Sequence, residues 1–184
     1  MALIQGKVRI IGGHWRSRLL TFPNRPDLRP TPDRIREAVF NWLGQDLSGL
    51  SCLDLFAGSG ALGFEAASRG AEQVVMVDAD ARIYRALQEN KERLQATQVE
   101  LTMMNALNFM NSDVRRFNVI FLDPPYRLEL LPKLLPLLPA HLEKDGLVYA
   151  ETRGTWIPDK QWNVKRSAKA GAVYYQLLEL ALNG

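Results

Sequence analysis

The stretch Asp123-Pro124-Pro125-Tyr126 has the residue types of a rigid binding corner. It follows the apolar run 118–122, which reads as a buried β-strand. The two prolines end the strand, because proline has no N–H and a fixed φ. The Asp123 carboxylate and the Pro124 carbonyl are two acceptors that could hold the hydrogens of an amine, while the Tyr126 ring could stack on a planar group. The alternative is an ordinary Asp-Pro turn with a surface tyrosine.

A glycine-rich motif precedes this corner in the sequence. Gly58, Gly60 and Gly63 in "LDLFAGSGALGFEAASRG" satisfy G-x-G-x-x-G, and Asp78 follows Gly58 by 20 residues. Glycines let the backbone approach a ligand, and an acidic side chain at that distance accepts from ribose hydroxyls. The motif therefore predicts a nucleoside site at a strand-to-helix turn, with tight helix packing as the alternative.

Asp54 helps to identify the nucleoside. It lies within the predicted strand, four residues before Gly58, where a dinucleotide site usually carries an aliphatic residue. A buried carboxylate is costly unless a positive group or hydrogen-bond donors pair with it. The ammonium group and positive sulfur of S-adenosylmethionine would compensate it, whereas a pyrophosphate would not. An NAD-binding oxidoreductase stays open as a second class, although Asp54 and the proline corner disfavour it.

The N-terminal end of the chain is basic. Residues 1–36 contain eight basic and two acidic residues, a net charge of +6, while the remaining 148 residues contain 15 basic and 18 acidic residues, a net charge of −3. Such an asymmetry favours an anionic partner for this end. A merely solvated arm is the alternative. The basic residues are Lys7, Arg9, Arg16, Arg18, Arg25, Arg29, Arg34 and Arg36.

Alternating strands and helices are expected to position these motifs. This order predicts an α/β fold with a doubly wound, mostly parallel sheet. Two consecutive strands at the end predict an antiparallel hairpin at the sheet edge and bring the sheet to seven strands. The predicted strands are 52–56, 73–77, 99–103, 117–122, 146–151, 162–165 and 173–180, and the helical segments are 61–69, 81–94, 106–110 and the proline-interrupted 128–138.

A small N-terminal unit precedes the sheet. Two short strands, 8–11 and 19–22, predict a hairpin. A helix should follow, with Thr31 as its N-cap and Pro32 as its first residue. Its apolar face repeats at helical spacing through Ile35, Val39, Trp42 and Leu43. We therefore divide the chain into an N-terminal arm, 1–45, and one domain, 46–184.

Bulk properties restrict the class of protein. The 184 residues are 47% apolar and 23% charged, as in one globular domain. The single cysteine, Cys52, allows no disulfide within the chain, and with His14 and His141 it has no metal-ligand spacing. The start has no secretory stretch, and prolines interrupt the leucine-rich run 128–138. We expect a cytoplasmic protein without a metal or a membrane span.

The motifs in this order resemble those of class I S-adenosylmethionine-dependent amino-methyltransferases. The pairing of the glycine motif with Asp-Pro-Pro-Tyr carries this resemblance. The stretches "RIIGGHWRSRLLTFP" and "RPTPDRIREAVFNWL" further resemble the RsmD family, over about Val8 to Leu180. That family implies a Rossmann-like fold and methylation of guanine N2 in 16S ribosomal RNA, within the small subunit or an assembly intermediate. We expect a monomer.

The resemblance assigns roles residue by residue. The catalytic residues would be Asp123, Pro124 and Tyr126. The residues around the cofactor would be Asp54, Ala57, Gly58, Ser59, Gly60, Asp78, Asn105 and Ala106. RNA would contact Arg9, Arg16, Arg18, Arg29, Thr31 and Arg34. Asn105 departs from the pattern, because such enzymes usually have an acidic residue facing the adenine amine there.

The target base stays open at the level of the residues. The same corner could serve adenine N6 or cytosine N4 in DNA or another RNA. The absence of room for a large target-recognition domain disfavours a sequence-specific DNA enzyme. A non-catalytic RNA-binding assembly factor is a third class, which the proline corner disfavours.

Overall fold

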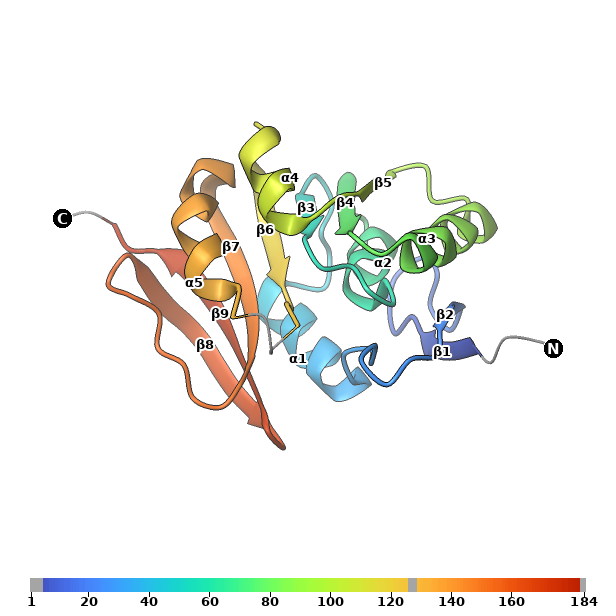
Figure 1. Ribbon diagram of the computed structural model, residues 1–184, viewed down its shortest axis with the longest axis horizontal. Helices are drawn as coiled ribbons and strands as arrows, with labels where there is room; N and C mark the ends of the chain where they lie inside the picture. Colours follow the sequence, from blue (N-terminus) through green and yellow to red (C-terminus); the bar gives the residue numbers. More distant parts are fainter. Residues whose placement is uncertain (1–4, 126–128, 183–184) are drawn as a thin grey trace.

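The computed structural model describes residues 5–125 and 129–182, in which seven strands form one mixed sheet (Figure 1). The strand order is β5-β4-β3-β6-β7-β9-β8. The first five are mutually parallel, whereas β9 runs antiparallel between β7 and β8. The strands are β3 (Ser51–Asp54), β4 (Gln73–Asp78), β5 (Val99–Met103), β6 (Phe117–Leu122), β7 (Leu142–Arg153), β8 (Trp162–Ala170) and β9 (Val173–Leu180). The predicted seven-stranded fold with its C-terminal hairpin is confirmed.

Both faces of the sheet are buried, as a doubly wound fold requires. Successive residues of a strand point to opposite faces, so Cys52 and Phe121 belong to one core while Leu53 and Leu122 belong to the other. The first core includes residues of α2 (Ala61–Ser68) and α3 (Ala81–Leu94). The second includes residues of α4 (Ala106–Ser112) and α5 (Leu131–Leu134).

Several elements differ in their bounds from the prediction; β8, for example, extends to Ala170 rather than to 165, and β3 ends at Asp54 rather than at 56. Two further differences concern the leucine-rich segment and β7. The leucine-rich segment forms the short α5 and then a 3₁₀ helix (Leu135–His141), because its prolines cannot continue a regular α-helix. Strand β7 is longer than 146–151, since Leu142 already pairs with Phe117 before a register shift. Neither difference moves the carboxyl end of the sheet, where the chemical motifs lie.

The N-terminal unit is a hairpin followed by a helix. Strands β1 (Gln5–Arg9) and β2 (Leu19–Pro23) are antiparallel, and α1 (Asp33–Leu43) follows. Leu20 of the hairpin and Val39 of α1 lie in the same buried core as Cys52 of the sheet. Asn90 of α3 pairs with the Thr21 backbone through both of its amide atoms. The division at residue 45 stays a prediction, and the two parts share one core.

The predicted N-cap of α1 is wrong. The helix begins at Asp33 after Pro32, and no side chain caps it. Pro32 has an extended ψ of 150°, so its carbonyl receives the first helical N–H groups, from Ile35 and Arg36. Thr31 lies one residue too early to cap; it is buried, and its carbonyl accepts from Arg36 Nε at 3.0 Å. The structure also shows Trp42 half-buried and stacked on Tyr175.

The loop after β1 is docked on the C-terminal end of α2. The Ser68 carbonyl accepts from His14 N at 2.7 Å, and Ser68 Oγ donates to the Gly12 carbonyl at 2.6 Å. Gly13 has φ +79°, and a Cβ there would lie 2.0 Å from the Ser68 carbonyl oxygen. The close approach therefore requires glycine at this position.

This packing gives a prediction about stability. Gly13→Ala should lower the free energy of unfolding by about 1–3 kcal/mol more than Gly154→Ala, the range for forcing an atom into a packed contact. Gly154 is the matched control, since its φ is +83° but a Cβ there would meet nothing within 4 Å. Urea denaturation of both variants measures the difference, and equal losses would contradict the contact.

Candidate active site

The glycine loop joins β3 to α2 at the carboxyl end of the sheet. Gly58 and Gly60 have φ of +53° and +83°, a region that favours glycine. A Cβ at Gly60 would lie 2.6 Å from the Phe64 ring. Gly63 serves packing instead, because a Cβ there would lie 2.8 Å from the Met76 side chain. The loop is thus held in a shape that exposes backbone to a ligand.

Asp54 fixes the start of α2. Its side chain is 2% exposed, and Oδ2 accepts from the Gly63 N–H at 3.0 Å. Burial raises the pKa of Asp54 to about 7, against the opposing effect of the Gly63 hydrogen bond. A positive group above this carboxyl would favour its charged form.

Asp78 joins the glycine loop to the end of β4. Its carboxylate accepts from the N–H of Gly58 and from the N–H of Asp80, each at 3.0 Å. Burial is the main cause of its raised pKa. A carboxylate has about four acceptor positions, so ribose hydroxyls could still bind to Asp78.

A segment of the N-terminal arm lies over this loop. Arg25 pairs with Asp80 at 2.5 Å and with Asp27 at 2.6 Å. The Leu28 side chain is 3.1 Å from the Cβ position of Gly58. The arm therefore covers one side of the nucleoside site. Leu28 and Gly58 are far apart in the sequence, so no local pattern predicted this contact.

Asn105 and Ala106 begin α4 at the next strand end. The Asn105 Oδ1 accepts from the N–H of Leu107 at 2.9 Å and of Asn108 at 3.3 Å, so it caps the helix. Asn is a favoured N-cap residue, and this explains the amide here without reference to a ligand. Its assignment to the adenine amine stays a prediction.

The proline corner follows β6, directly beside the glycine loop. Asp123 is half-buried and Pro124 is buried. Burial and the nearby charges of Glu151 and Asp54 raise the pKa of Asp123 well above its usual range. Tyr126 lies outside the described residues. Pro124 and Pro125 border a cavity of about 350 Å³, together with residues of α5 and of the segment after β7.

Sequence reasoning missed Glu151, which also borders this cavity. It is 5% exposed and lies at the carboxyl end of β7, beside β6. Its position after the apolar run 146–150 was a usable signal, because that end of a parallel sheet commonly holds ligands. The carboxylate accepts from the Tyr149 hydroxyl at 2.9 Å.

The predicted RNA-contacting residues lie on the hairpin with its loop and on the segment that leads into α1. Arg29 and Thr31 precede α1 and Arg34 lies in its first turn, and the backbone carbonyls of Thr31 and Arg9 accept from the same Arg36 guanidinium. Arg9, Arg16 and Arg18 lie on the hairpin side, where Arg18 donates to the Arg93 carbonyl near the end of α3. The structure thus joins Arg9 to Thr31 through Arg36, whereas Arg18 contacts α3.

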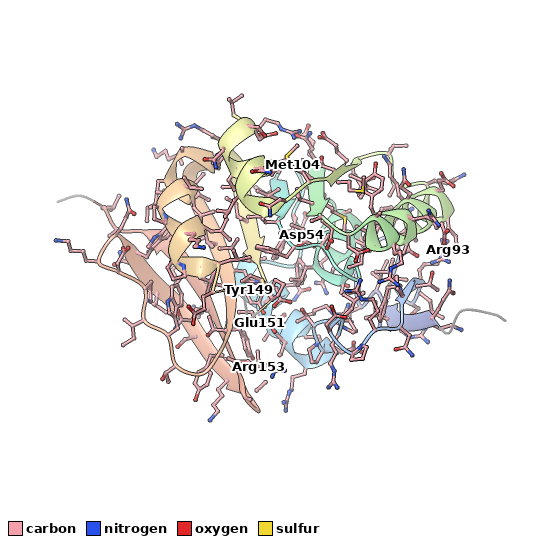
Figure 2. The ribbon with its side chains drawn as sticks, viewed as in Figure 1. Asp54, Arg93, Met104, Tyr149, Glu151 and Arg153 are labelled. Atoms are coloured by element: carbon pink, nitrogen blue, oxygen red, sulfur yellow. The ribbon has the colours of Figure 1, made fainter. Side chains whose placement is uncertain are left out.

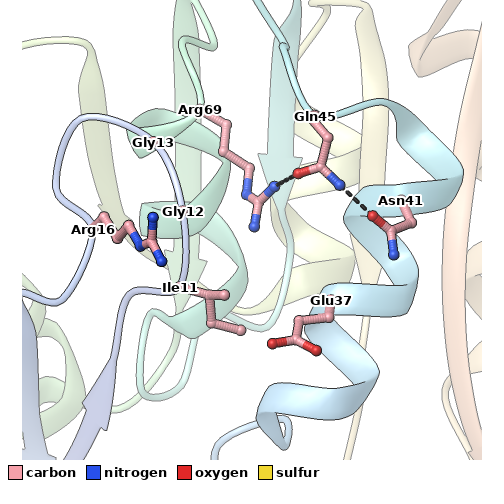
Figure 3. Close-up of a pocket in the computed structure, with 8 residues that line it drawn as sticks. All are labelled: Ile11, Gly12, Gly13, Arg16, Glu37, Asn41, Gln45 and Arg69. Atoms are coloured by element: carbon pink, nitrogen blue, oxygen red, sulfur yellow. Dashed lines mark hydrogen bonds between the residues drawn. The ribbon is translucent and has the colours of Figure 1, made fainter.

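A hollow of about 500 Å³ lies between the loop after β1 and α1 (Figure 3). Its lining residues are Ile11, Gly12, Gly13, Arg16, Glu37, Asn41, Gln45 and Arg69. Figure 3 shows that Gln45 links the Arg69 side chain to Asn41. The loop after β1, which carries Arg16, thus borders a polar hollow away from the proline corner.

Comparisons with known proteins agree with this geometry. A family model described as "Conserved hypothetical protein 95" matches residues 8–179. The chain is 39% identical to ribosomal RNA small subunit methyltransferase D (RsmD) of Escherichia coli, covering 97% of this chain and 93% of that protein. The Haemophilus influenzae protein of the same name is 37% identical, covering 95% of each chain. The chain belongs to the RsmD family.

Solved structures support the same assignment. A putative methyltransferase from Escherichia coli has a TM-score of 0.86 at 37% identity, covering 95% of this chain and 98% of that one. A putative methyltransferase solved with S-adenosylhomocysteine shares the fold at 16% identity and a TM-score of 0.66, covering 79% of this chain and 48% of that one. This RsmD-family chain is a class I methyltransferase with S-adenosylmethionine as its cofactor.

The residues of the site fit that cofactor. The glycine loop leaves its backbone open, Asp78 offers acceptors for a ribose, and Asp54 lies beneath the loop as a carboxyl whose charged form a positive ligand would favour. Within residues 5–125 and 129–182, no group of three or more His, Cys, Asp or Glu could hold a metal ion. No helix of that part of the chain is long and apolar enough to cross a membrane.

A prediction about cofactor binding follows from Asp78. Asp78→Ala should weaken S-adenosylmethionine binding by roughly 1–3 kcal/mol, the scale for losing hydrogen bonds to a charged acceptor. Calorimetric titration of the cofactor measures the change. Glu143→Ala is the control, because Glu143 is exposed near the opposite end of the sheet. An unchanged Kd in Asp78→Ala would remove this residue from the site.

Proposed function

We propose that this protein transfers a methyl group from S-adenosylmethionine to the N2 amine of a guanine in 16S ribosomal RNA of the small subunit. One observation carries the chemistry: a glycine loop with its acidic partner and an Asp-Pro corner end the adjacent strands β3, β4 and β6. Family membership supports the choice of ribosomal RNA, since the relatives are named ribosomal RNA small subunit methyltransferase D.

The proline corner overcomes the weak nucleophilicity of a base amine. Its lone pair is delocalised into the ring, so attack requires the nitrogen to pyramidalise. The Asp123 carboxylate and the Pro124 carbonyl each accept one amine hydrogen, which turns the lone pair toward the methyl group. Because the prolines fix the backbone, this geometry is set before reaction. Tyr126 lies outside the described residues, so the stacking role that the family resemblance assigns to it stays a prediction.

The bound cofactor supplies the methyl group on a positive sulfur. The lone pair of the amine forms the new N–C bond while the C–S bond breaks, and its electrons stay on sulfur. The methylated nitrogen then carries one proton too many. Asp123 is the nearest acceptor in this scheme, and burial together with Glu151 and Asp54 raises its pKa, so it can take that proton.

In this proposal, different residues contact different parts of the S-adenosylmethionine molecule. Ala57, Gly58, Ser59 and Gly60 line its methionine portion, with Asp54 beneath them. Asp78 binds the ribose hydroxyls, and Asn105 with Ala106 borders the adenine. The arm contacts RNA through Arg9, Arg16, Arg18, Arg29, Thr31 and Arg34. The proposal places a monomer in the cytoplasm, acting on the small subunit or an assembly intermediate.

The alternative is an amine of adenine or cytosine in DNA or another RNA. The acceptor pair alone would serve those amines equally. Radiolabelled methyl transfer to small subunits, naked ribosomal RNA and DNA in parallel, followed by nucleoside mapping, decides between them. We expect N2-methylguanosine in small-subunit RNA; label in adenine or cytosine would overturn the proposal.

The corner gives a prediction about the chemical step. Asp123→Ala should lower the single-turnover rate by about 10²-fold or more, the cost of a lost transition-state hydrogen bond. Asp123→Asn should be milder, since an amide oxygen still accepts. Cofactor affinity should change little in both variants. Transfer at the parent rate in Asp123→Ala would refute activation of the amine by this carboxylate.

The arm gives a prediction about RNA binding. Replacing Arg16 and Arg18 with Ala should weaken RNA affinity and lower the slope of log K against log salt by about 0.7–0.9 per lost phosphate contact. Cofactor binding should not change. The control replaces Lys133 and Lys144, two exposed residues of α5 and β7, and removes the same charge. If the arginine pair and the lysine pair affected RNA affinity and its salt dependence equally, the arm would have no specific role in RNA binding.

A further inference from the structure

Glu151 and Asp123 stand side by side at the carboxyl end of the sheet. In the parallel pairing of β6 and β7, Leu122 lies opposite Ala150, so the next residues are neighbours. Phe121 and Tyr149, two residues earlier on each strand, face the same core. Because side chains alternate along a strand, Asp123 and Glu151 project on that face too. Figure 2 shows Tyr149 and Glu151 in succession along β7.

The Glu151 carboxylate is held in place. The Tyr149 hydroxyl donates to it at 2.9 Å. The fully buried Tyr149 ring packs edge-on against the Phe121 ring, with 6.2 Å between the ring centroids. Glu151 also borders the cavity beside Pro124, with Trp156 among the other residues around it. The structure thus places a second fixed carboxylate beside the position that the base must occupy if Asp123 and Pro124 bind its amine.

Guanine differs from the other amino bases at N1, one of the two ring nitrogens next to its amine. Guanine N1 carries a hydrogen and donates, whereas adenine N1 and cytosine N3, beside their amines, have lone pairs and accept. A carboxylate is an acceptor only. Placed beside the amine site, it binds guanine and repels the lone pair of the other two bases. Sites that hydrogen-bond a substrate group discriminate strongly against analogues that lack it.

We propose that Glu151 determines base specificity by accepting the N1–H of the target guanine next to the amine held by Asp123 and Pro124. This inference rests on the proposed function. It supplies what the proline corner lacks, because that acceptor pair alone does not distinguish the three amines.

The experiment replaces the target guanine with 2-aminopurine. This base keeps the N2 amine, but its N1 is an acceptor without a hydrogen. Small subunits are reconstituted with ribosomal RNA that carries guanine or 2-aminopurine at the mapped position. Single-turnover methyl transfer is then measured for the wild type and for Glu151→Gln. The glutamine amide can donate to N1 of 2-aminopurine, which the carboxylate cannot.

We expect the wild type to methylate guanine faster than 2-aminopurine. In Glu151→Gln the ratio of these two rates should fall by roughly tenfold or more, the scale of one unsatisfied buried polar group. Comparing the two proteins cancels the intrinsic reactivity of the two amines. Glu143→Gln, the same change at an exposed position of β7, should keep the wild-type preference. An unchanged or wider preference in Glu151→Gln would overturn the inference, even if both rates fall.

The wild type alone supplies a second test that no folding defect can affect. Equal rates on guanine and 2-aminopurine would overturn the role of Glu151. Failure of the wild type to methylate subunits that carry guanine would instead overturn the proposed function. The two failures are therefore distinguishable.

Discussion

The buried carboxylate of Glu65 is the interaction on which the assembly of the site depends. It is fully buried in α2 and receives the backbone N–H of Ile11 at 2.9 Å and of Gly12 at 2.8 Å. Arg36 and Arg69 pair with it at 3.3 Å and 2.9 Å. A buried charge is tolerated only with such partners. One residue therefore joins the hairpin loop, α1 and the helix that begins at the glycine loop.

Arg36 extends this connection to the segment before α1 and to the end of β1. Its buried guanidinium donates to the carbonyls of Thr31 and Arg9, at 3.0 Å and 2.9 Å, and pairs with Asp33 at 2.5 Å. The segment that the family resemblance assigns to RNA is thus fastened to the same helix as the cofactor loop. Helix α2 has the glycine loop at one end and the docked hairpin loop at the other. The arm and the catalytic site form one continuous structure.

The sequence predicted those features that short-range rules determine. The glycine turn at Gly58 and Gly60 and the strand stop at Pro124 depend on single residues, and the parallel sheet follows from alternating elements. The pairing of Arg36 with Glu65 joins residues 29 positions apart, so no local pattern shows it. The cap at Thr31 failed for a related reason: a tertiary contact to its carbonyl and the extended Pro32 set the helix start.

The three carboxylates at the sheet end make the site electrostatically incomplete without its ligands. Asp54 ends β3, Asp123 follows β6 and Glu151 lies in β7, on neighbouring strands, and burial together with the charges of Glu151 and Asp54 raises the pKa of Asp123. Like charges at such a site favour retention of protons. In the proposed function, the sulfonium and ammonium groups of the cofactor would supply positive charge here, and a base edge made of N–H donors would supply hydrogens. In the proposed reaction, the repulsion among these carboxylates therefore favours a base that donates over one that accepts.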